Sequence, residues 1–146
     1  ALFPTNSSKN FDQLFAKKAE VAIYAHVHHQ LLRYGSDERI VLNPGSVGEP
    51  FNGQAKLQAD WRAQYLLLTL DQQGLGGMNF RHVAYDRTAE ERAARAADLP
   101  YLEVYLRHLK TGRVYTHDQD YLAEFNQRFG YAADYAAYRD RLKVGK

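Results

Sequence analysis

Two histidines separated by one residue, His26 and His28, are the side chains of this sequence best suited to hold a metal ion. They follow the continuous apolar run at residues 21–24, which is typical of a strand buried on both faces. Side chains alternate along an extended segment, so the two imidazoles are expected to project to the same side. The pair could ligate one metal ion or be divided between two neighbouring ions.

The absence of cysteine restricts the chemistry further. Disulfides, thiolate ligands and a cysteine nucleophile are excluded together, so any transition metal must be held by imidazole and carboxylate. Two ligands are fewer than the three or four protein ligands of an ordinary zinc site. Taken alone, His26 and His28 could therefore also be two surface histidines that lie near each other by accident.

A second motif, Asn43-Pro44-Gly45-Ser46, lies downstream of the histidines. By itself it predicts a simple type I or II turn, in which proline and glycine set the backbone angles. Together with the histidine segment, this motif resembles the Gly-His-Thr-His motif and the Asn-Pro-Gly-Ser loop of the calcineurin-like metallophosphoesterases, in their small bacterial and archaeal phosphodiesterase branch. The resemblance extends roughly over residues 11–86, with Ala25 in place of the usual glycine and Val27 in place of the common threonine.

The resemblance implies a dinuclear centre of divalent metal ions (manganese, iron, zinc or nickel) in the complete enzyme. His26 and His28 would bind different ions, and Asn43 and Ser46 would brace the loop beside them. No residue of this chain is assigned a catalytic role. His29 lies outside the motif, either at the substrate opening or in solvent.

The remaining motifs of that family, which carry the aspartates and the Asn-His pair, lie N-terminal to the segment seen here and do not occur in these 146 residues. The resemblance therefore implies a metal-dependent phosphoester hydrolase that acts on a small phosphoester, such as a nucleotide. This chain would be its C-terminal part, inactive alone and partnered by the N-terminal half of the same protein. The opening at Ala1 without methionine suggests a cut end.

Two other functions remain open. A member of the same fold that has lost turnover would serve as a binding or regulatory module, and the missing N-terminal motifs distinguish it from the enzyme. A structural zinc module would need a further ligand near His26 and His28, for which Asp37 and Glu49 are candidates only by proximity in sequence.

The elements expected around these residues give an α/β (α+β) fold: the C-terminal half of a four-layer αββα metallophosphoesterase sandwich, followed by a helical extension. Periodicity predicts a short helix over residues 8–18, a hairpin from residues 30–34 and 40–42, and a strand pair from residues 65–70 and 78–85. From Thr88 onward the spacing of apolar residues predicts four helices. We accordingly assign residues 1–86 to the metallophosphoesterase domain and residues 87–146 to the extension, which would shape substrate access or an oligomer contact.

Three tyrosines, Tyr131, Tyr135 and Tyr138, share one helical stripe. Base stacking on a nucleotide is one interpretation, but a core-facing helix surface is the ordinary explanation of such spacing and is the one we adopt. The histidines His82 and His108, like His117, are scattered over other elements and are expected to be structural or exposed to solvent.

Composition gives little support to nucleic acid or membrane as partners. The net charge of +2 arises from 19 basic and 17 acidic residues mixed along the chain, without the basic runs that bind phosphate backbones. No apolar stretch approaches the ~20 residues of a membrane span, and no signal peptide is visible. A cytoplasmic protein is expected.

Overall fold

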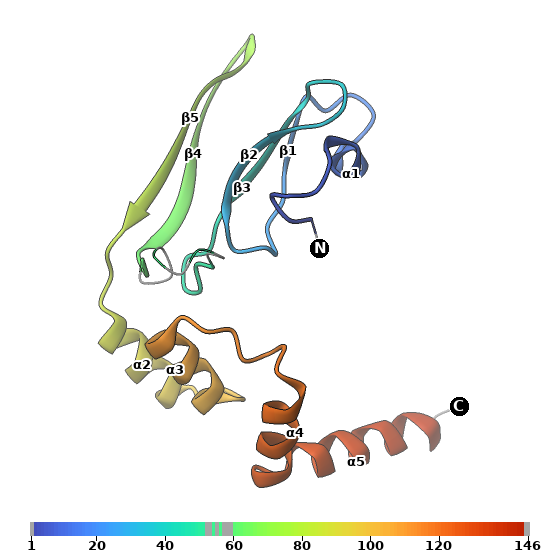
Figure 1. The fold of residues 1–146 in the computed structure, drawn as a ribbon, viewed down its shortest axis with the longest axis vertical. Coiled ribbons are helices and arrows are strands. Elements are labelled where there is room, and N and C mark those ends of the chain that lie inside the picture. Colours follow the sequence, from blue (N-terminus) through green and yellow to red (C-terminus); the bar gives the residue numbers. More distant parts are fainter. Residues whose placement is uncertain (1, 52–53, 55, 57–59, 145–146) are drawn as a thin grey trace. The chain divides into compact units, whose positions relative to one another are not determined.

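The computed structural model describes residues 2–51, 54, 56 and 60–144 and has a mixed α+β structure (Figure 1). The chain divides into two compact units, Ala1–Glu90 and Glu91–Lys146. The first holds all the described strands and the second is helical. The division lies inside a helix, shortly after the boundary at Asp86 that the sequence suggested.

A three-stranded sheet forms the centre of the first unit. Its strands are β1 (Val21–Ile23), β2 (Gln30–Tyr34) and β3 (Ile40–Pro44), in the order β1-β3-β2. β1 runs parallel to β3, and β2 is antiparallel to β3, as the predicted hairpin requires. Val41 and Leu42 in the central strand are completely buried, as expected for apolar residues covered on both faces of a sheet.

One face of this sheet is covered by a short helical segment, α1 (Ser8–Phe11) followed by the 3₁₀ turn η1 (Asp12–Leu14). Phe11 is fully buried there, and the Arg33 guanidinium of β2 stacks over its ring at 5.3 Å. The helix predicted over residues 8–18 is thus too long. The Asp12 carboxylate accepts hydrogen bonds from the Ser36 amide at 2.8 Å and from the Ser36 hydroxyl, so it is drawn to the β2–β3 turn where the α-helix ends.

A separate two-stranded hairpin, β4 (Ala63–Asp71) and β5 (Gly74–Val83), stands beside the three-stranded sheet (Figure 1). The prediction placed the second strand at residues 78–85 and the turn at residues 72–77. The turn is in fact tight, because the Asp71 carboxylate accepts from the Gln73 amide at 2.8 Å and Gly74 takes a φ of +115°. The two glycines that follow, Gly76 and Gly77, therefore lie within the strand.

The four helices expected in the second part of the chain are all present. They are α2 (Arg87–Ala96), α3 (Leu102–Thr111), α4 (Gln119–Arg128) and α5 (Tyr131–Val144). Val104, Tyr115 and Phe125 form the buried cluster of the helical unit, with Tyr121 and Tyr131 packed against it. Within the described parts of the chain, no helix is both long and apolar enough to span a bilayer.

The core-facing interpretation of the tyrosine stripe is wrong for two of its three members. Tyr131 is half-buried, but Tyr135 is 65% exposed and Tyr138 is 53% exposed. Of the three tyrosines of the stripe, only Tyr131, in the first turn of α5, packs against the buried cluster. The rest of the stripe lies on the surface of the helical unit.

Candidate functional site

The histidine segment follows β1 as a bent loop. β1 ends at Ile23, and the backbone takes positive φ values at His26 (101°) and His28 (46°). Such angles are costly for residues other than glycine, at about 1–3 kcal/mol each. The extended geometry predicted for residues 26–29 is therefore wrong, and strand alternation does not decide where these rings project. The buried side chain of Val27 anchors the loop between them.

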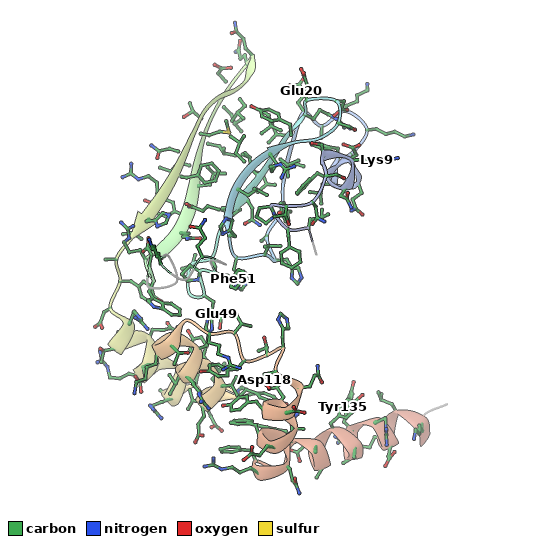
Figure 2. The ribbon with its side chains drawn as sticks, in the orientation of Figure 1. Lys9, Glu20, Glu49, Phe51, Asp118 and Tyr135 are labelled. Atoms are coloured by element: carbon green, nitrogen blue, oxygen red, sulfur yellow. The ribbon has the colours of Figure 1, made fainter. Side chains whose placement is uncertain are left out.

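His28 is held by the loop that follows β3. Its Nδ1 lies 3.0 Å from the Glu49 carbonyl oxygen, and the Phe51 amide donates to the His28 carbonyl at 2.8 Å. Figure 2 labels Glu49 and Phe51 in this loop. A carbonyl oxygen only accepts, so the proton must be on Nδ1 and the lone pair of a neutral ring is on Nε2. A ring oriented in this way is prepared to ligate a metal through Nε2.

His29, which the sequence left unassigned, has the same kind of support. Its Nδ1 lies 3.1 Å from the Phe51 carbonyl oxygen, so its Nε2 also carries the lone pair when the ring is neutral. Both His28 and His29 are half-buried. The only sequence signal for this similarity is the direct adjacency of the two histidines, because residue 51 is remote in the chain.

His26 differs from these two, because its side chain is exposed. Among the described residues, no hydrogen bond joins the rings of His26 and His28. Over the same part of the chain, no three His, Cys, Asp or Glu side chains are grouped so that they could hold a metal ion. Asp37 instead pairs with Arg39 at 2.5 Å.

Asn43 and Ser46 lie on either side of the turn after β3. Asn43 is fully buried, and its Oδ1 accepts from the Gly45 amide at 2.9 Å. The Ser46 Oγ accepts from the Glu49 amide at 3.0 Å. Ser46 thereby fixes the residue whose carbonyl receives the His28 proton, which connects the turn to the histidine loop through two hydrogen bonds.

Gly45 allows this turn to approach β4. Its φ is +86°, and a Cβ at this position would lie 2.1 Å from the Gln64 Oε1 atom and 2.8 Å from the Gln64 Cβ atom. The Gln64 amide donates to the Ser46 carbonyl at 2.9 Å. Glycine is needed here for both its backbone angle and its lack of a side chain.

Tyr24 lies between the end of β1 and the N-terminal segment. Its hydroxyl donates to the Leu2 carbonyl at 2.8 Å. Burial raises the pKa of the Tyr24 hydroxyl, while the nearby Asn43 side chain opposes that rise. Tyr24 therefore stays a neutral hydrogen-bond donor beside the histidine loop.

A polar chain that the sequence did not reveal joins the two sheets next to His29. Gln30 donates through Nε2 to the carbonyls of Tyr65 and Arg81, both at 3.2 Å, and its Oε1 lies 2.8 Å from the His82 Nε2 atom. The other ring nitrogen of His82 lies 3.1 Å from the Asp60 carboxylate. These contacts give His82 a structural role, which is one of the two roles expected for it.

Asp60 ends this polar chain in a bidentate pair with Arg62, at 2.7 and 2.8 Å. The hydrogen bond from Arg62 holds the pKa of the Asp60 carboxyl well below its usual range, and the contact with His82 acts in the same direction. Residues 60 and 82 are remote from Gln30 in the chain, so no local pattern could have predicted their meeting.

No known family profile matches the chain, and no curated protein matches it in sequence.

Proposed function

We propose that this chain is the C-terminal part of a metal-dependent phosphoester hydrolase of the calcineurin-like metallophosphoesterase type. It would contribute His26 and His28 to a metal centre that an N-terminal segment of the same protein completes. The observation that carries the proposal is the contact between the His28 Nδ1 atom and the Glu49 carbonyl. Metal-ligating histidines usually donate their other ring N–H to a carbonyl or carboxylate, which orients the ring and makes it more basic.

The donor set suits the proposed metals. Imidazole is a common ligand of zinc, iron and nickel, and the chain offers no thiolate that would favour a different ion. When bound, two such ions would supply Lewis acidity and a water nucleophile of lowered pKa for attack on phosphorus. The part of this chain is to hold and orient ligands, with Ser46 acting on His28 through Glu49.

The exposed edge of β1 supports the assignment of the chain to one half of a larger sandwich. Among the described residues, β1 pairs with β3 alone, and its Ile23 side chain is 55% exposed. Parallel strands are normally buried inside a sheet with both faces covered. Further strands added next to β1 would bury Ile23 and extend the sheet towards the four-layer αββα arrangement.

The first test uses this chain and a paramagnetic probe. Mn²⁺ added below one equivalent should broaden the NMR signals of the His26 and His28 rings before that of His117, a histidine on the exposed surface of the helical unit. The Nε2 resonance of His28 should show the Nδ1–H tautomer before metal is added. Equal broadening of His117 would mean that the ion binds non-specifically and would contradict the proposal.

The second test uses the longer protein that includes an N-terminal segment. Bis-p-nitrophenyl phosphate hydrolysis should fall at least ~100-fold in His28→Ala, whereas Ser46→Ala should lose about tenfold because it disturbs only the support of the ligand. His117→Ala is the matched control and should keep full activity. A longer protein that binds Mn²⁺ at His28 and hydrolyses no phosphoester would be a binding or regulatory module of the same fold.

A further inference from the structure

The surface of α5 carries an apolar stripe that continues past the core of the helical unit. Tyr131 packs on this core, with its ring centroid 6.2 Å from that of Phe125. Tyr135, Tyr138 and Leu142 follow on the same side of the helix and are 65%, 53% and 56% exposed. Figure 2 shows Tyr135 on the part of α5 that lies beyond its first turn.

The spacing of the stripe is that of a coiled-coil seam. The intervals between residues 131, 135, 138 and 142 are four, three and four, which is the a/d pattern that brings two helices together. This set is symmetric about the point midway between residues 136 and 137. In an antiparallel pair of α5 helices, Tyr135 of one copy would therefore meet Tyr138 of the other, while Tyr131 keeps its place against the core of its own unit.

Charges beside the seam are complementary in this antiparallel arrangement. Asp134 lies in the first turn of α5 and Arg141 in its last turn. Seven residues apart, they occupy the same flank of the helix and are both g positions of the heptad. Antiparallel pairing would bring Asp134 of each copy to Arg141 of the other. A parallel pair would instead bring Asp134, a g position, to the e position Arg139 of the other copy, so the two orientations differ in which arginine Asp134 meets.

Neither charge is already neutralised nearby. Within the part of the chain that the structure describes, the side chains of Asp134 and Arg141 form no ion pair, whereas Asp140 on the far side of the helix lies 3.5 Å from Lys143 and 3.9 Å from Arg139. Asp140, the acidic partner in these ion pairs, thus lies away from the seam. The charges beside the seam remain available to a second helix.

We propose that α5 is a homodimerisation helix, and that it pairs with the α5 of a second copy of this chain in antiparallel orientation. A helix of 14 residues is only about 21 Å long, so it would bury less than the ~800 Å² per partner of a standard interface. The dimer should accordingly be weak and dependent on concentration. This proposal makes no use of the metal site.

The experiment is sedimentation velocity on the full chain between about 5 and 500 μM, a range chosen to span a micromolar Kd. The wild type should approach twice the chain mass at the upper end. Tyr138→Ala should weaken association at least tenfold without disturbing the helix, because alanine is the best helix former. Asp140→Ala, on the opposite side of α5, is the matched control and should dimerise like the wild type.

A charge exchange tests the orientation. Asp134→Arg and Arg141→Asp should each weaken the dimer several-fold, and their combination should recover association relative to either single change, with helix content checked by circular dichroism. A mixture of the two single variants should also associate more strongly than either alone, which keeps the test valid if the double variant is less helical. A chain that is monomeric throughout, or a dimer that Tyr138→Ala does not affect, would overturn the proposal.

Discussion

The rings of His28 and His82 differ in the partners of their nitrogen atoms. His28 faces one carbonyl oxygen through Nδ1, which leaves Nε2 with a lone pair. His82 has an acceptor at each nitrogen, the Gln30 Oε1 atom on one side and the Asp60 carboxylate on the other. His28 is therefore suited to ligation, whereas His82 acts as a bridge between the two sheets.

Asp60 gives a testable dependence of stability on pH. Because its folded-state pKa is depressed, its ion pair stabilises the fold fully above the unfolded pKa of about 3.9, and that effect is lost progressively as the pH falls from there through the folded-state pKa. Asp60→Asn should lower the free energy of unfolding by about 1 kcal/mol at pH 7, since partly exposed ion pairs contribute about 0–1 kcal/mol. Urea unfolding at pH 7 and pH 3 measures the difference between the two proteins.

The difference between wild type and Asp60→Asn should be smaller at pH 3 than at pH 7, because at pH 3 the unfolded chain binds a proton at Asp60 while the folded carboxylate, with its depressed pKa, is still largely ionised. Asp140→Asn serves as the control, because the Asp140 side chain is 65% exposed and its ion pairs are longer. A destabilisation by Asp60→Asn that is equal at both pH values would show that the carboxylate charge is not responsible.

At the scale of elements, the turn after β3 determines how the histidine loop and the β4–β5 hairpin meet. The turn contacts the loop through Ser46 and Glu49, and it contacts β4 through the backbone bond between Gln64 and Ser46. Its close approach to β4 depends on Gly45, where a side chain would overlap Gln64. A substitution at this residue should therefore disturb both neighbours.

Gly45→Ala should destabilise the fold by about 2–4 kcal/mol, from a positive φ that alanine tolerates poorly and from the overlap with Gln64. Gly74→Ala is the matched control: it also has a positive φ, but a Cβ there has no neighbour within 4 Å. Thermal unfolding should show the larger loss for Gly45→Ala. Equal losses would mean that backbone strain alone acts at both positions.

The elements that the sequence predicted well are those formed by local patterns. The antiparallel pairing of β2 and β3 and the four helices after Arg87 follow from periodicity and turn residues within short windows. The prediction was less accurate where a remote contact decides the outcome. α1 ends where the Asp12 carboxylate binds Ser36, a residue of the β2–β3 turn.

The candidate site was predicted by residue type but not by geometry. The histidines and the Asn-Pro-Gly-Ser turn could be identified from the chain, but the positive φ at His26 and His28 could not, because these residue types usually avoid it. The support of His29 by Phe51 and the meeting of Gln30 with His82 depend on tertiary contacts between distant residues. Tertiary structure also decides that Tyr135 and Tyr138 are exposed, since spacing alone does not reveal what covers a stripe.

At the scale of the whole molecule, the chain consists of two units with separate cores. Phe11 and Val41 are buried in Ala1–Glu90, and Val104 and Phe125 are buried in Glu91–Lys146. Units with their own cores are expected to lose structure independently.

Paired core truncations test this independence. Val41→Ala and Val104→Ala each remove two buried methyl groups and should destabilise their own unit by about 2 kcal/mol. Hydrogen exchange should accelerate in β1, β2 and β3 for Val41→Ala, and in α3 and α4 for Val104→Ala. Acceleration across both units in either variant would show a single cooperative structure.

The chain has one tryptophan, Trp61, and it lies in Ala1–Glu90 with the Arg87 guanidinium 4.8 Å from its ring. Seven of the eleven tyrosines are in Glu91–Lys146, where several stack in the aromatic cluster. At the long-wavelength edge of the near-ultraviolet absorption band of a protein, almost all of the light is absorbed by the indole ring of tryptophan. Emission excited there therefore reports on the β-rich unit alone, so the unmodified chain carries its own optical label for the half that holds the histidines.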